Sequence, residues 1–154
     1  MSKTLSRLAA IKALRRAHSH AKWGIKDLTR NKRLTAGLVS RLEAHRHLPE
    51  VGDFLRRLQQ DPTHVDSREL HYMQRRYVDG RPLDSASAMD ALFARVLDDP
   101  AAKVYQYGGL RYQIRSPRED WIAILDPDGT RVSIYPDLDD DLGDPLWTLK
   151  DLIP

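Results

Sequence analysis

The feature that most constrains the fold is a change in hydrophobic period after Pro100. Before this proline, apolar side chains recur every three or four residues, which is helical spacing. After it they alternate with polar side chains, as in a β-strand that has one buried face. The alternation is clearest near residues 110–116 and 130–135. The sequence therefore predicts helices up to about residue 100 and a sheet after it.

Five helices are predicted, over about residues 4–20, 35–47, 49–60, 67–78 and 85–97. The first is amphipathic, with Leu5, Leu8, Ile11 and Leu14 turned inward, and Thr35 is expected to cap the second. The last has the most regular apolar spacing. Its inward positions are Met89, Leu92, Phe93, Val96 and Leu97, which follow the helical template throughout.

Four strands are predicted, over 103–107, 110–116, 121–126 and 130–135. Gly108-Gly109 suits a two-residue type I′ turn, and Pro127-Asp128-Gly129 suits a type I turn closed by a glycine bulge. The second turn would place Ala123 opposite Ser133 and Trp121 opposite Tyr135. We expect a single α+β domain over 1–154: helices (1–100) packed on a four-stranded antiparallel meander (101–136), followed by an acidic tail (137–154).

The predicted meander has one polar face that carries positive charge. Its polar positions are Arg111, Gln113, Arg115, Arg131, Ser133 and Tyr135, and they alternate with Leu110, Tyr112, Ile114, Val132 and Ile134. A solvated face usually mixes charges of both signs, whereas this one holds three arginines and no acid. The pattern predicts a concave surface that binds phosphate groups.

The two parts of the chain differ in charge. Residues 1–60 hold 14 Lys or Arg and 4 Asp or Glu, whereas residues 61–154 hold 11 and 18. Such polarity is typical of a basic part that meets a polyanion, although a solvated basic helix pair gives the same count. The acidic stretch 137–144 could fold back on the basic part or repel a wrong partner.

Composition and spacing exclude several classes of site. There is no Cys, so disulfides and Cys-ligated zinc are excluded. No segment resembles a signal peptide or could span a bilayer, so we expect a cytoplasmic protein without a membrane partner. His18/His20 and His45/His47 are two residues apart, and a regular helix points such pairs in different directions. We therefore expect no metal site and no cofactor.

Two segments resemble a known family. His18-Ser-His20-Ala-Lys22-Trp23-Gly24-Ile25 is similar to a His-Ala-x-x-Phe-Gly-Ile stretch, and Ile124–Tyr135 to a strand pair with Asp-Gly and Ser-x-Trp. Both occur in colicin D-type tRNA-cleaving toxin domains, part of a broader group of small metal-independent ribonuclease toxins that includes the RelE-like ones. The resemblance implies helices followed by a four-stranded antiparallel sheet. It also implies that His20 is a general acid or base, Lys22 and Tyr135 contact RNA, and Ser133 lies at the scissile phosphate.

Three functions are compatible with these features. The first is a metal-independent endoribonuclease, toxin-like and acting on RNA such as tRNA, with a cognate immunity or antitoxin protein as a further partner. Its catalytic set would be His20, Arg115, Ser133 and Tyr135, and its RNA contacts Lys12, Arg15, Arg16, Lys22, Arg111 and Arg131. The second is a non-enzymatic phage- or mobile-element-type protein that binds nucleic acid or a nucleoprotein complex and inhibits it. The third is an immunity or antitoxin-like module.

A purely structural role is an alternative explanation for each candidate residue. His20 could only complement the dipole of its helix, and Ser133 and Tyr135 could be ordinary strand residues. Arg111 and Arg115 could pair with Glu119, Asp120 or the acidic tail. Trp23 and Trp147 are expected to anchor the core or a lid.

Overall fold

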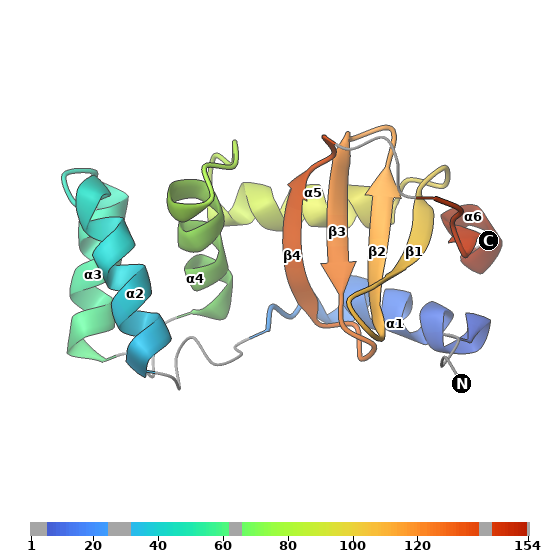
Figure 1. Ribbon diagram of the computed structural model, residues 1–154, viewed down its shortest axis with the longest axis horizontal. Coiled ribbons are helices and arrows are strands. Elements are labelled where there is room, and N and C mark those ends of the chain that lie inside the picture. The colour runs from blue at the N-terminus through green and yellow to red at the C-terminus, as the bar shows by residue number, and fades with distance from the viewer. Residues whose placement is uncertain (1–5, 25–31, 62–65, 139–142, 154) are drawn as a thin grey trace. The chain divides into compact units, whose positions relative to one another are not determined.

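The computed structural model describes residues 6–24, 32–61, 66–138 and 143–153, without the side chains of 32–35. The predicted α+β class is confirmed, with helices preceding an antiparallel sheet (Figure 1). Two compact units divide the chain: Met1–Trp23 with Ser87–Pro154, here the sheet unit, and Gly24–Ala86, here the helical unit. The helical unit is thus an insertion in the sequence of the sheet unit.

The sheet unit contains helices α1 (Arg7–His20) and α5 (Ala86–Leu97). The Ser6 side chain caps α1 by accepting a hydrogen bond from the Ala9 N–H; the predicted start near residue 4 lies outside the described residues. The inward face of α1 consists of Ala10, Ala13, Leu14 and Ala17, whereas Leu8 is 62% exposed. The predicted inward position of Leu8 is therefore wrong, because small alanines form the contact surface. All five predicted apolar positions of α5 are buried.

The sheet has the order β4-β3-β2-β1-β5, and all neighbouring strands are antiparallel. Its strands are β1 (Lys103–Tyr107), β2 (Arg111–Ser116), β3 (Trp121–Leu125), β4 (Arg131–Pro136) and β5 (Trp147–Thr148). The predicted four-stranded meander is confirmed and extended. Strand β5, and helix α6 (Leu149–Leu152) after it, lie in the predicted acidic tail, where Trp147 pairs with Val104.

Both predicted hairpin registers need correction. Tyr107 pairs with Arg111, so the first loop has three residues and Leu110 belongs to the loop rather than the strand. In the second hairpin, Leu125 pairs with Arg131 beside the turn, but Val132 is then bulged out of the ladder. The bulge shifts the rest of β4 by one residue. Ala123 therefore lies opposite Ile134, not Ser133, and Trp121 lies opposite Pro136.

The sheet is buried on the face that α1 and α5 cover. By the strand pairing this face carries Val104, Tyr112, Ile114, Ala123, Leu125 and Ile134, all buried. Figure 1 shows the opposite face toward the viewer, with α1 and α5 behind the strands. On that opposite face Ile122 and Ile124 pack with the bulged Val132, and Tyr135 lies against them. Strand β3 is thus buried on both faces.

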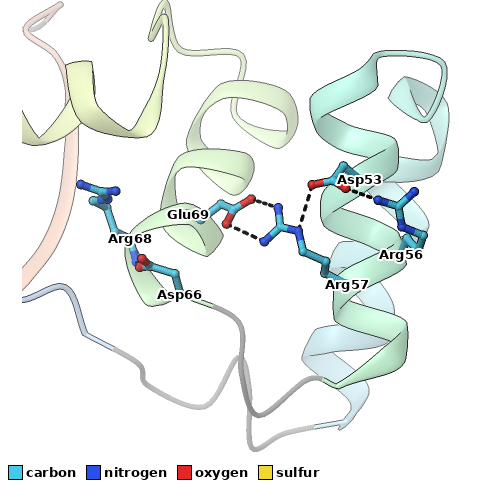
Figure 2. Close-up of polar contacts among 6 residues, drawn as sticks. All are labelled: Asp53, Arg56, Arg57, Asp66, Arg68 and Glu69. Atoms are coloured by element: carbon cyan, nitrogen blue, oxygen red, sulfur yellow. Dashed lines mark hydrogen bonds and ion pairs between the residues drawn. The ribbon is translucent and has the colours of Figure 1, made fainter.

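The helical unit contains α2 (Lys32–Leu42), the 3-10 turn η2 (Glu43–His45), α3 (Pro49–Gln60), α4 (Ser67–Met73) and the π-helical turn η4 (Gln74–Val78). Helix α2 begins before Thr35, whose side chain lies outside the described residues. Pro49 occupies the first turn of α3, where a missing N–H costs nothing. Figure 2 shows that Arg57 of α3 donates to Asp53 on its own helix and to Glu69 of α4. This ion-pair network links α3 to α4.

Candidate nucleic-acid interface

The predicted catalytic residues lie in two separate places. His20, at the end of α1, lines a pocket with Arg16, Lys22, Asp128, Gly129 and Thr130. Arg115 lines another pocket, with Lys103, Tyr105, Pro117, Asp120, Asp137 and Gly143. The two pockets have no lining residue in common. By the strand pairing, Ser133 and Tyr135 share the face of Arg115, opposite the one that α1 covers. The structure therefore does not bring His20 together with the other three.

The arginines of the open sheet face are paired with carboxylates. The guanidinium of Arg115 donates two hydrogen bonds to Asp137, and Arg111 Nε donates to Asp126 Oδ1 at 2.8 Å. Gln113 Nε2 donates to the Tyr135 hydroxyl at 2.8 Å. The expectation of a face with uncompensated positive charge is wrong, because the acids come from segments next to the strands rather than from the strands themselves. Pairing of Arg115 with the acidic end is confirmed through Asp137.

Arg131 lies on the covered side of the sheet and is only 2% exposed. Its guanidinium forms an ion pair with Asp90, donates to the Ala17 carbonyl and lies 4.6 Å from the centre of the Phe93 ring. Burial lowers the pKa of Arg131, and Asp90 partly offsets that effect. The predicted surface of three arginines is therefore wrong at this position. Trp23, also buried, donates to Asp90 and anchors the core, as expected.

Helix α1 carries several basic side chains and no acidic residue of its own. Among the described residues, Lys12, Arg15 and Arg16 have no ion pair, and all three are exposed. Ten other described arginines each have a carboxylate partner. They are Arg46, Arg56, Arg57, Arg75, Arg81, Arg95, Arg111, Arg115, Arg118 and Arg131. We call Lys12, Arg15, Arg16, His20 and Lys22 the cationic cluster.

The pocket beside this cluster exists because the β3–β4 loop lies directly against α1. Gly129 has a φ of +90°, and a Cβ atom there would lie 2.7 Å from both the Ala13 carbonyl oxygen and the Cβ atom of Arg16. Only glycine accepts both the conformation and the contact. On the other side, the Arg131 N–H donates to the Lys22 carbonyl at 2.7 Å. These backbone contacts bring the loop and the cations together around a pocket of about 320 Å³.

Asp128 is the acidic group of the pocket. Its Oδ1 accepts the Thr130 N–H at 2.9 Å, and this bond, with the Thr130 hydroxyl and the charge of Lys22, lowers the pKa of Asp128. The pocket thus offers the cationic side chains of Arg16 and Lys22, an imidazole, a hydroxyl and one ionised carboxylate. Such a set can bind a phosphate group and accept a hydrogen bond beside it.

Sequence reasoning identified the basic residues of this pocket but not its acidic wall. Asp128 and Gly129 were expected only as parts of a turn. Their Asp-Gly signal specifies the turn but not the helix against which it packs. Packing of the turn on α1 depends on long-range contacts, so no local pattern could have revealed it.

Comparison with protein-family models, curated proteins and solved structures finds no match for the chain. In the described part of the chain, no group of three or more His, Asp or Glu side chains could hold a metal ion. No helix in that part is long and apolar enough to cross a membrane.

Proposed function

We propose that the protein binds nucleic acid, with RNA as its partner, through the cationic cluster of α1 and the segment after it, together with the adjoining pocket. The observation that supports this proposal is the segregation of charge. Ten of the arginines elsewhere in the described structure are paired with carboxylates, whereas Lys12, Arg15 and Arg16 lie exposed on one helix without such partners. Unneutralised cations on one helix are the electrostatic footprint of a phosphate-binding surface.

The cluster suits the phosphate backbone of a nucleic acid because several of its cations lie close together on one helix. Lys12 and Arg16 are four residues apart, and Arg15 is three residues from Lys12, so all three lie near one another on α1. Each phosphate contact releases condensed counterions from the nucleic acid. Binding should therefore weaken steeply as salt concentration rises.

The test is a salt titration of RNA binding, followed by fluorescence anisotropy of a labelled single-stranded RNA. In the quadruple variant, Lys12, Arg15, Arg16 and Lys22 are replaced by Gln. We expect its salt slope to be shallower by about 3, because each lost contact to a single strand accounts for about 0.7. Helix α1 should remain intact, since Gln is a good helix former and the inward alanines are unchanged. Circular dichroism checks this point.

A charge-matched control separates specific contacts from overall charge. It replaces four arginines that have carboxylate partners, Arg46, Arg56, Arg95 and Arg118, by Gln. The control should keep the wild-type slope. Equal losses in the two variants would contradict a specific surface on α1, and absence of salt-dependent binding in the wild type would overturn the proposal.

RNA cleavage is a second candidate, because His20 lies in the same pocket as Arg16 and Lys22. In such a reaction the 2′-oxygen attacks the adjacent phosphorus, the bond to the 5′-oxygen breaks, and a 2′,3′-cyclic phosphate forms. An imidazole can take the 2′ proton or supply one to the departing oxygen, and the two cations can stabilise the phosphate charge. The open sheet face has no part in this form of the hypothesis.

The cleavage hypothesis is tested by incubating RNA with the protein in EDTA. His20→Ala should abolish cleavage but retain binding, and 2′-O-methyl RNA should stay intact. His18→Ala is the matched control, since His18 contacts Asp98 and the Leu97 carbonyl instead of the pocket. Intact RNA with the wild-type protein would leave nucleic-acid binding as the function.

A further inference from the structure

We infer that the pocket distinguishes RNA from DNA, with Asp128 accepting a hydrogen bond from the 2′-hydroxyl of a nucleotide whose phosphate lies beside Arg16 and Lys22. This inference rests on the proposed nucleic-acid binding and specifies its chemistry. It concerns the backbone rather than the bases.

The pocket contains one carboxylate, that of Asp128, among the cations of Arg16 and Lys22. Hydrogen bonds from Thr130 and the charge of Lys22 lower the pKa of Asp128, so the group is ionised at neutral pH. An ionised carboxylate only accepts hydrogen bonds. The negative charge of Asp128 repels a phosphate bound in the same pocket. A hydrogen bond donated by the ligand to Asp128 can offset this repulsion.

The backbones of DNA and RNA differ in this one respect. Phosphate and ether oxygens accept hydrogen bonds, so an internal stretch of the DNA backbone contains no hydrogen-bond donor. The RNA backbone has one donor per nucleotide, the 2′-hydroxyl, which is the group by which proteins tell the two apart. RNA can therefore donate a hydrogen bond to Asp128, whereas the DNA backbone has no donor to offset the repulsion between this carboxylate and the phosphate.

The geometry of the loop supports this role for Asp128. Its Oδ1 is held by the Thr130 N–H, and the neighbouring Gly129 is fixed against Ala13 and Arg16. Because a carboxylate has two oxygens and about four lone-pair positions, the hydrogen bonds from the N–H and the hydroxyl of Thr130 leave capacity for a ligand. The pocket volume of about 320 Å³ lies at the lower end of the range for small-molecule sites. That volume suits a single nucleotide.

The experiment compares the binding of single-stranded oligouridine and oligodeoxyuridine of equal length at the same salt concentration. The two probes share their base and differ only in the 2′-hydroxyl. We expect the wild type to bind the ribo-oligomer roughly tenfold more tightly, as for a hydrogen bond to a charged acceptor. Asp128→Asn should bring the two affinities to within about twofold of each other, because the neutral amide no longer repels phosphate and accepts more weakly.

Asp151→Asn is the matched control, since it removes the same charge from an exposed position on α6. It should leave the preference for RNA unchanged. Equal binding of both oligomers by the wild type, with a normal salt slope, would overturn the inference but not the proposed function. Absence of salt-dependent binding to either would overturn both. A preference for RNA that persists in Asp128→Asn would contradict the role of Asp128.

Discussion

Arg131 and Asp90 form an ion pair on the helix-covered side of the sheet, with 3.1 Å between Nη1 and Oδ1. The Arg131 side chain is 3% exposed, and its guanidinium also lies over the Phe93 ring. Asp90 accepts the Trp23 indole N–H as well. This pair therefore joins β4, α5 and the segment after α1, and it removes Arg131 from any surface that could meet RNA.

Asp90→Asn should destabilise the protein by about 3 kcal/mol, because it leaves the buried Arg131 charge without a counterion. Urea unfolding measures the loss. The double variant Asp90→Asn with Arg131→Met removes the charge as well and should recover part of the lost stability. If Asp90→Asn were as stable as the wild type, the pair would have no role in holding the sheet to α5.

Asp99 should make stability depend on pH in the acid range. Burial raises its pKa, but hydrogen bonds from the Ser116 hydroxyl and from the N–H groups of Ala101 and Arg118 outweigh this effect and lower the pKa overall. Its folded pKa is then below its unfolded value of about 3.9. The stabilisation is fully present well above that value and is lost as pH falls through the folded pKa.

The measurement is urea unfolding of the wild type and Asp99→Asn over a pH series. We expect the variant to be less stable near neutral pH and the difference to shrink below about pH 4. A difference that stays constant at every pH would contradict this account of Asp99.

Gly129→Ala should destabilise the sheet unit and weaken RNA binding together. Its positive φ costs an alanine about 1 kcal/mol or more, and the new methyl group would also collide with the backbone of α1. Gly109→Ala is a close control, because Gly109 has a φ of +84° but no atom within 4 Å of its Cβ position. Urea unfolding should show the larger loss for Gly129→Ala. Equal losses would mean that the contact with α1 contributes nothing.

The sequence predicted those parts of the fold that depend on local periodicity. The apolar positions of α5 and the alternation in β2 were sufficient to predict these two elements, since each follows one period without interruption. The bulge at Val132 was not predictable, because nothing in a Val-Ser-Ile run marks an extra residue, and the bulge reverses the face of Arg131 relative to Ser133. Strand β5 was missed because two residues give no alternation to detect.

For the candidate site, too, local features could be predicted from the sequence and long-range contacts could not. The basic residues of α1 were visible in the sequence as helical positions without acids nearby. The pairing of Arg115 with Asp137 and the contact of Gly129 with Arg16 join distant segments, so local pattern could not show which arginines are neutralised and which are exposed.

The most direct test of the account is to map where RNA binds by NMR, from changes in backbone amide shifts as a short oligouridine is added. We predict that the largest changes cluster on residues 12–22, in α1 and the segment directly after it, and on residues 128–130 of the β3–β4 loop. Changes centred on Arg115, Ser133 and Tyr135, or confined to the helical unit, would contradict the assignment of the nucleic-acid interface to the cationic cluster.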